Sequence, residues 1–266
     1  MQARQLQYQG YLQTPYLWYG KGPAGLIQLE LSPWKVGKFS QQVNGNLRLG
    51  KLVERFVSEE FKEHPNIEIL AENIQIQRQK LTLGELDCLL LFNGEPVHLE
   101  IIYKFYLYDP NVGETELDHW IGPNRRDSLV QKITKLSEKQ LPLLYNPQTA
   151  GVLEELGLKP ETMLQRVCFK AQLFLPLDYK EPITVLNPHT VYGYYVHFKE
   201  MDRFNSCKIY IPRKHDWLIT PHPVVDWMNF ESAKQRLSEF YKEESAPLVW
   251  VKHPKGSIEK LFVIWW

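Results

Sequence analysis

The chain has 266 residues, of which 44% are hydrophobic, and its 31 Lys and Arg residues balance 31 Asp and Glu residues. This composition is typical of a globular protein and excludes a disordered or fibrous chain. Because the formal net charge is zero, any nucleic-acid partner must be held by a local basic surface and not by the charge of the whole molecule.

The three cysteines, Cys88, Cys168 and Cys207, show no CxxC spacing. They are interpreted as small core residues of a protein in a reducing compartment, which excludes a disulfide framework and a zinc site. The N-terminal segment has no apolar run like that of a signal peptide, and no window approaches the ~18 apolar residues of a membrane-spanning helix. We therefore expect a cytoplasmic protein without a membrane partner.

The first predicted element is a helix over residues 46–63. Its apolar side chains recur near every 3.6 residues, and His64-Pro65 ends the pattern. Three strands are expected next, over residues 67–77, 81–92 and 97–108. The pair Asn93-Gly94 between the last two strands favours a tight hairpin turn. Both of these strands contain nearly continuous apolar runs, which places them in a sheet covered on both faces.

A second helix is predicted over residues 126–140, because apolar side chains from Leu129 to Leu136 form one stripe that packs on the sheet. The opposite face carries three lysines, Lys132, Lys135 and Lys139. This face is interpreted as solvated, with the alternative that it follows a phosphate backbone.

One more buried strand is predicted over residues 166–175. Beyond it, prolines interrupt the apolar runs, which predicts a β-rich extension with a helix near residues 230–241 and a closing hairpin. The fold class is therefore α/β, with a central mixed sheet flanked by helices. The predicted parts are an N-terminal extension (1–44), the core (45–177) and a C-terminal extension packed on the core (178–266).

Two carboxylates occupy apolar strands of this core. Asp87 precedes the apolar run of its strand, and Glu100 lies inside the next strand. An ionised carboxylate in such a place is costly unless it is paired or bound to a cation. Lys104 shares a strand face with Glu100, because side chains alternate along a strand. Pairing of the strands about the hairpin turn is expected to bring two carboxylates and one amine together.

This set of groups favours phosphodiester hydrolysis. Mg²⁺ and Mn²⁺ prefer one or two carboxylates, completed by water and substrate phosphate. A cation held in this way stabilises charge on a phosphoryl oxygen and lowers the pKa of a bound water, while a nearby lysine neutralises developing charge.

The segments Gly84-Glu85-Leu86-Asp87 and Glu100-Ile101-Ile102-Tyr103-Lys104 resemble the PD-(D/E)XK nuclease superfamily, whose members share a restriction-endonuclease-like core. Residues 49–56, 98–107 and 119–127 resemble more closely a bacterial domain-of-unknown-function family placed in that superfamily. The resemblance is stronger over residues 45–175 than over the C-terminal third.

The resemblance implies a catalytic role for four residues. Asp87 and Glu100 would bind Mg²⁺ or Mn²⁺, Lys104 would be the catalytic amine, and Glu54 would be an additional acid on the first helix. The superfamily lysine usually follows the glutamate by two residues, where this chain has Ile102. Lys104 lies about 6–7 Å further along the strand.

Other interpretations of these residues stay open. Asp87 and Lys104 could form a structural salt bridge inside the sheet, and Glu54 could be a solvated helix residue. His98 and His119 are interpreted as scaffold histidines, because neither has a second His or Cys at metal-binding spacing.

A phosphate-binding segment is expected between the third strand and the second helix. Asn124, Arg125 and Arg126 precede the helix, where two guanidinium groups and unpaired backbone N–H groups would clamp an anion. The alternative is a turn with Asp127 near the helix cap. The resemblance implies that Gln131, one turn along the helix, faces the site.

Two functions follow from these observations. The first is a metal-dependent nuclease acting on nucleic acid, DNA rather than RNA. The second is a catalytically silent module of the same fold that binds nucleic acid or a protein partner. The two acids in apolar strands favour the first function, and the neutral net charge favours the second.

Overall fold

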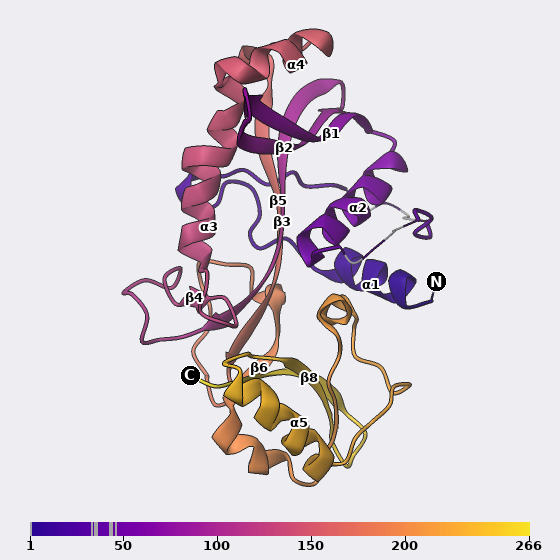
Figure 1. The fold of residues 1–266 in the computed structure, drawn as a ribbon, viewed down its shortest axis with the longest axis vertical. Coiled ribbons are helices and arrows are strands. Elements are labelled where there is room, and N and C mark those ends of the chain that lie inside the picture. Colours follow the sequence, from indigo (N-terminus) through magenta and orange to yellow (C-terminus); the bar gives the residue numbers. More distant parts are fainter. Residues whose placement is uncertain (1, 33, 35–36, 43–44, 46) are drawn as a thin grey trace. The chain divides into compact units, whose positions relative to one another are not determined.

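The computed structural model describes residues 2–32, 34, 37–42, 45 and 47–266. Over these residues the protein is an α/β fold, with nine strands in one mixed sheet and helices beside it (Figure 1). Contacts divide the chain into two compact units. The central unit contains Tyr16–Tyr103 and Gln131–Lys170. The terminal unit contains Met1–Pro15, Lys104–Val130 and Ala171–Trp266. The division into residues 1–44, 45–177 and 178–266 stays a prediction.

The central unit begins with the elements that the sequence predicts. These are α2 (Leu49–Lys62), β1 (Ile67–Arg78), β2 (Leu81–Phe92) and β3 (Glu95–Tyr108), of which β3 continues into the terminal unit. The predicted helix start at Asn46 lies outside the described residues. Strand order is β1-β2-β3-β5, and α2 and α3 flank β3 and β5 in Figure 1.

The β2–β3 hairpin has the predicted two-residue turn. Phe92 pairs with Glu95, and both Asn93 and Gly94 have positive φ, at 53° and 82°. Positive φ at both central residues defines a turn whose twist matches the twist of paired strands, which is why Asn-Gly is favoured there. This turn fixes the register of the whole hairpin.

The second predicted helix is correct in position but not in form. It contains α3 (Leu129–Lys135), a π-helical turn (Leu136–Gln140) and a 3₁₀ turn (Leu141–Tyr145). The helix starts three residues later than expected, because Arg125 has a φ of 53° and Gly122 N–H donates to the Asp127 carbonyl. Asp127 therefore lies in a turn and not within the helix.

The remaining elements of the central unit complete its core. They are α4 (Ala150–Glu155) and β5 (Leu164–Pro176), which confirms the predicted strand over 166–175 and continues into the terminal unit. Buried residues of β1, β2 and the helical segments pack as one cluster: Ile76, Leu86, Leu89, Leu143, Leu144, Leu153 and Met163.

The terminal unit has its own sheet segment, in the order β5-β6-β9-β8-β7, with β4 beside β3. Its elements are α1 (Gln2–Gln13), β4 (Trp120–Ile121), β6 (Val191–His197), β7 (Lys208–Tyr210), α5 (Phe230–Lys242), β8 (Leu248–Lys252) and β9 (Ile258–Ile264). The predicted helix near residues 230–241 and the closing hairpin are confirmed. Helix α1 was not predicted, because it buries Tyr8 and Tyr11 and has no regular apolar stripe.

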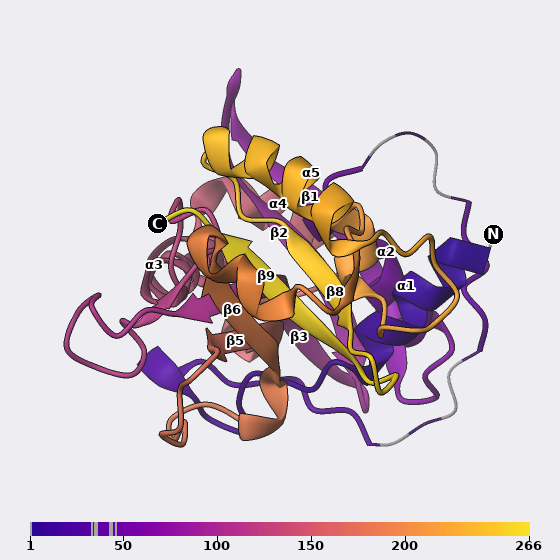
Figure 2. The same cartoon turned by 90° about the horizontal axis from the view of Figure 1, so that it is seen from below.

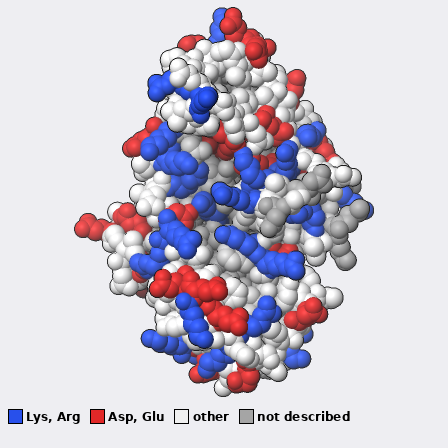
Figure 3. Space-filling view, in the orientation of Figure 1, with Lys and Arg blue, Asp and Glu red and all other residues white. Residues whose placement is uncertain are grey.

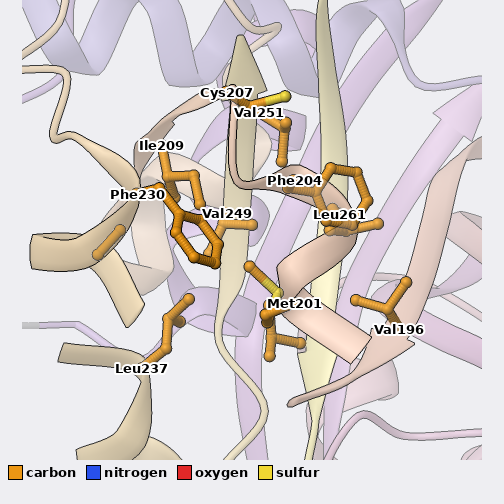
Figure 4. Close-up of a cluster of buried hydrophobic side chains, with 12 residues drawn as sticks. Val196, Met201, Phe204, Cys207, Ile209, Phe230, Leu237, Val249, Val251 and Leu261 are labelled. Atoms are coloured by element: carbon orange, nitrogen blue, oxygen red, sulfur yellow. The ribbon is translucent and has the colours of Figure 1, made fainter. Parts of the chain in front are cut away.

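Helix α5 packs on the sheet of the terminal unit (Figure 2). Asn229 caps the helix by accepting a hydrogen bond from Ser232 N–H at 2.9 Å. Its buried residues Phe230 and Leu237 meet β8 and β9 in a single apolar cluster. Figure 4 shows this cluster, which also includes Val196, Met201, Phe204, Cys207, Ile209, Val249, Val251 and Leu261.

All three cysteines are buried core residues, as the sequence predicts, and none of them is in a disulfide. Cys207 Sγ lies 3.5 Å from His253 Nδ1, and His253 Nε2 lies 2.5 Å from Glu259 Oε1. Burial is the largest effect on Cys207 and raises the pKa of its thiol, so Cys207 is a protonated core residue. Within the described ranges, no helix has the length and apolarity needed to cross a membrane.

Candidate active site

Asp87 and Glu100 lie at neighbouring positions of the central unit. Cys88 of β2 pairs with Leu99 of β3, so the next position along the hairpin places Asp87 opposite Glu100. Ile101 N–H donates to Asp87 Oδ2 at 2.9 Å. The strand pairing that the Asn93-Gly94 turn predicts is therefore confirmed, and it brings the two carboxyl groups together.

The Glu100 carboxyl is completely buried and held at both oxygens. Gln165 Nε2 donates to His98 Nδ1 at 3.3 Å, which leaves the proton of the imidazole on Nε2. That Nε2–H then donates to Glu100 Oε1 at 3.2 Å. Gln140 Nε2 donates to the other oxygen of Glu100, Oε2. Burial lowers the pKa of His98 to about 4, so this histidine is a neutral donor that orients the carboxylate.

Three carboxyl groups of the central unit have pKa values raised to about 7, those of Glu54, Asp87 and Glu100. Burial is the largest cause for each. The charge of Glu100 raises the pKa of Asp87 further, and the charge of Asp87 raises that of Glu54, whereas a side-chain hydrogen bond with Asp87 lowers the pKa of Glu100. Buried carboxyl groups with raised pKa values are typical of functional sites.

Glu54 belongs to this cluster and not to a solvated helix surface. Its side chain is 15% exposed, and its Oε2 accepts a hydrogen bond from Lys51 Nζ at 2.8 Å. The same ammonium donates to Asn73 Oδ1 at 2.9 Å and to Glu85 Oε1. Lys51 therefore connects α2 with β1 and β2 beside the acids.

Lys132 is the second lysine whose charge acts on the acids. Its Nζ donates to Gln140 Oε1 at 2.7 Å. Its charge opposes the rise in pKa of both Asp87 and Glu100. The prediction that this lysine lies on a simply solvated face is therefore wrong, because its side chain is directed to Gln140.

Lys104 lies in the terminal unit, where its Nζ forms an ion pair with Asp127 Oδ2 at 2.6 Å. A structural salt bridge between Asp87 and Lys104 stays an alternative. A catalytic role for Lys104 stays a prediction.

The segment before α3 is held by contacts within the terminal unit. Asn124 Oδ1 accepts a hydrogen bond from Ala246 N–H at 2.8 Å. Arg125 pairs with Asp109 at 2.6 Å and stacks on the Trp266 ring, 4.5 Å from its centroid. These contacts are those of a structural turn. Arg126 and Gln131 are exposed, and a phosphate-binding role for all four residues (Asn124, Arg125, Arg126 and Gln131) stays a prediction.

Sequence reasoning missed the polar residues that surround the acids. Lys51 could have been found, because it lies one helical turn before Glu54 on the same face of α2. Gln140 and Gln165 carry no local signal, because each reaches its partner through packing of elements that are distant in sequence.

The donor set fits a hard divalent cation. Asp87 and Glu100 offer carboxylate oxygens, the ligands that Mg²⁺ and Mn²⁺ prefer. Among the described residues, no three or more His, Cys, Asp or Glu side chains form a group that could hold a metal alone. A cation here would therefore use the two carboxylates and complete its shell with water and substrate, as Mg²⁺ commonly does.

Comparison with known proteins gives a family and no function. No curated protein and no solved structure matches the chain significantly. The model of one family matches residues 4–264, almost the whole chain. The protein therefore belongs to the family described as domain of unknown function DUF1853.

Proposed function

We propose that this protein is a metal-dependent nuclease of the PD-(D/E)XK type that hydrolyses phosphodiester bonds in nucleic acid. The observation that carries the proposal is the contact between the Asp87 and Glu100 side chains next to Cys88–Leu99, the last pair of β2 and β3, with Glu54 beside them and the pKa of all three raised to about 7. A module that only binds a partner has no evident need for a buried pair of carboxyl groups in contact with each other.

Asp87 and Glu100 would hold Mg²⁺ or Mn²⁺. The chemistry that such a cation supplies is stabilisation of a phosphoryl oxygen and a lowered pKa for a bound water. His98 and Gln140 keep the Glu100 oxygens in fixed directions through their hydrogen bonds. Glu54, with a pKa near 7, is suited to exchange a proton with water at neutral pH.

The surface of the central unit supports a polyanionic substrate. Lys and Arg side chains gather over α2 and α3 in Figure 3. The sequences of these helices and the π-helical turn supply Lys51, Arg55, Lys132, Lys135 and Lys139. A local basic surface of this kind provides the electrostatic contact with phosphates that a neutral chain otherwise lacks. DNA is the expected substrate class.

The second candidate function is a silent nuclease-fold module that binds nucleic acid or a protein partner. The observation that favours it is the ion pair between Lys104 and Asp127, because it engages the amine that the resemblance implies for catalysis. Like the nuclease, a silent module of this kind is expected to bind nucleic acid. Unlike the nuclease, it is expected not to cleave it.

A cleavage assay separates the two functions. Purified protein is incubated with single- and double-stranded DNA and RNA in Mg²⁺, in Mn²⁺ and in EDTA. We expect cleavage that requires the cation and falls by ~10²-fold or more in Glu100→Gln, because a cation that lacks a ligand is not positioned. The matched control is Glu95→Gln, an exposed residue on the same strand, which should retain wild-type activity.

Cleavage that persists in Glu100→Gln would show that another site or a contaminant is responsible. Nucleic-acid binding without cleavage by the wild-type protein would contradict the nuclease and support the silent module.

A further inference from the structure

The geometry points to Lys132, held in place by Gln140, as the amine that acts on the substrate phosphate, in place of Lys104. This inference rests on the proposed function and names a further residue of the same site. It follows from the π-helical turn in the second helix, from two consecutive hydrogen bonds and from the different contacts of the other lysines.

The π-helical turn explains why Lys132 and Gln140 meet. The two residues are eight positions apart, and in a regular α-helix, at about 100° per residue, they would lie roughly 80° apart around the axis. A π-helical turn adds one residue to a turn of the helix. With Leu136–Gln140 in that form, the effective separation is about that of seven α-helical residues, which places both side chains on the same face.

Gln140 joins the lysine to the acid pair. Its Oε1 accepts from Lys132 Nζ at 2.7 Å, and its Nε2 donates to Glu100 Oε2. The orientation of the Gln140 amide is fixed. Its oxygen must face Lys132, because an ammonium only donates, and its nitrogen must face Glu100, because a carboxylate only accepts. The chain Lys132–Gln140–Glu100 therefore sets the position of the ammonium relative to Glu100 through two hydrogen bonds.

The lysines near the acids differ in what they contact. Lys51 is engaged with Glu54, Glu85 and Asn73, and Lys104 is engaged with Asp127. Lys132 is engaged with Gln140, whose amide also holds Glu100, so the central unit connects its ammonium to a predicted ligand.

The reaction that Lys132 would assist is simple hydrolysis. The oxygen of a water bonds to phosphorus, and the ester P–O bond breaks. One water proton passes to the leaving oxygen, and the other leaves the new phosphate for the solvent. Negative charge grows on the phosphoryl oxygens and on the leaving oxygen during this step, and a fixed ammonium stabilises that charge.

The test replaces individual lysines by methionine and compares kcat and KM of the variants. We expect Lys132→Met to lower kcat by ~10²–10³-fold with little change in KM, which is typical of a lost charge at the reacting group. Lys80→Met, an exposed lysine between β1 and β2 that lies outside the proposed site, is the matched control and should keep the wild-type kcat. Lys135→Met, on the basic surface, should act on KM and leave kcat within a few-fold of wild type. Lys104→Met tests the alternative amine and should also keep kcat within a few-fold of wild type. Lys132→Arg should restore part of the lost kcat, because the charge is kept.

A second readout does not depend on activity. Loss of a positive charge beside a cation site strengthens cation binding, so Lys132→Met should bind Mn²⁺ several-fold more tightly than wild type in calorimetry. Lys135→Met should bind Mn²⁺ as wild type does. A variant that merely misfolds would bind it more weakly.

Three outcomes would overturn the inference. A larger loss of kcat in Lys104→Met than in Lys132→Met would assign the amine to Lys104. Equal losses in Lys132→Met and Lys135→Met would indicate a general basic surface. Unchanged Mn²⁺ affinity in Lys132→Met would contradict the placement of its charge. If the wild-type protein cleaves nothing, the proposed function fails, and the Mn²⁺ affinities still decide where Lys132 lies.

Discussion

The Glu100 side chain is completely buried. The free energy of unfolding of the protein therefore depends on whether this carboxyl group is protonated. Its pKa is raised to about 7, first by burial. A carboxyl whose pKa is higher in the folded than in the unfolded protein binds its proton more tightly after folding. Its contribution to stability is therefore largest below about pH 4 and decreases as the pH rises from about 4 to about 7. Asp87 and Glu54 act in the same direction.

We predict that Glu100→Gln changes stability in a pH-dependent way in EDTA. The quantity of interest is the free energy of unfolding of the variant minus that of wild type. This difference should be about 1–3 kcal/mol more positive at pH 8 than at pH 5, because the variant removes a charge that is buried at pH 8. At pH 5 the protonated glutamate and the glutamine are both neutral, so the buried charge that distinguishes the two proteins at pH 8 is absent. Urea denaturation at both pH values measures the difference.

Glu95→Gln serves again as control, since this exposed side chain should show no such dependence on pH. An equal loss of stability at pH 5 and pH 8 in Glu100→Gln would mean that Glu100 is only a structural acceptor for its two neighbours.

At the scale of elements, the β2–β3 hairpin could be predicted from sequence and the second helix only in part. Asn93-Gly94 has local conformational preferences that determine the turn, and the turn determines the register that brings Asp87 to Glu100. The π-helical turn has no comparable signal, because the choice between α and π hydrogen bonding depends on what the side chains meet. For this reason the sequence predicts a solvated position for Lys132, whereas its side chain contacts Gln140.

The same substitution should have opposite effects at two glycines of the central unit. Gly94 has a φ of 82°, so Gly94→Ala should destabilise the protein by about 1 kcal/mol. Gly50 lies near the start of α2, and nothing lies within 4 Å of an added Cβ. Gly50→Ala should stabilise the protein by about 0.5 kcal/mol, because alanine favours the helix. Thermal or urea denaturation of both variants provides the measurement.

A gain in stability in Gly94→Ala would contradict the positive φ of the turn. A loss in Gly50→Ala would contradict the open surroundings of that residue in α2.

At the scale of the whole molecule, the α/β class and the large mixed sheet could be predicted, but the organisation into units could not. Both units are discontinuous because β3 and β5 each pass from one into the other. Strand periodicity shows where a strand lies and not which neighbours it has at each end. Lys104 illustrates the consequence. It shares a strand face with Glu100, but it belongs to the terminal unit and pairs with Asp127.

The central claim is that Asp87 and Glu100 form a site for a divalent cation. Because their pKa values lie near 7, cation binding at pH 7 must displace protons. The most direct measurement is calorimetric titration with Mn²⁺ in buffers of different ionisation enthalpy, on wild type, Asp87→Asn, Glu100→Gln and Glu95→Gln. Wild type and Glu95→Gln should each bind Mn²⁺ at one site with proton release, and the other two variants should lack that site. Equal Mn²⁺ binding by all four proteins, or no binding by wild type, would contradict it.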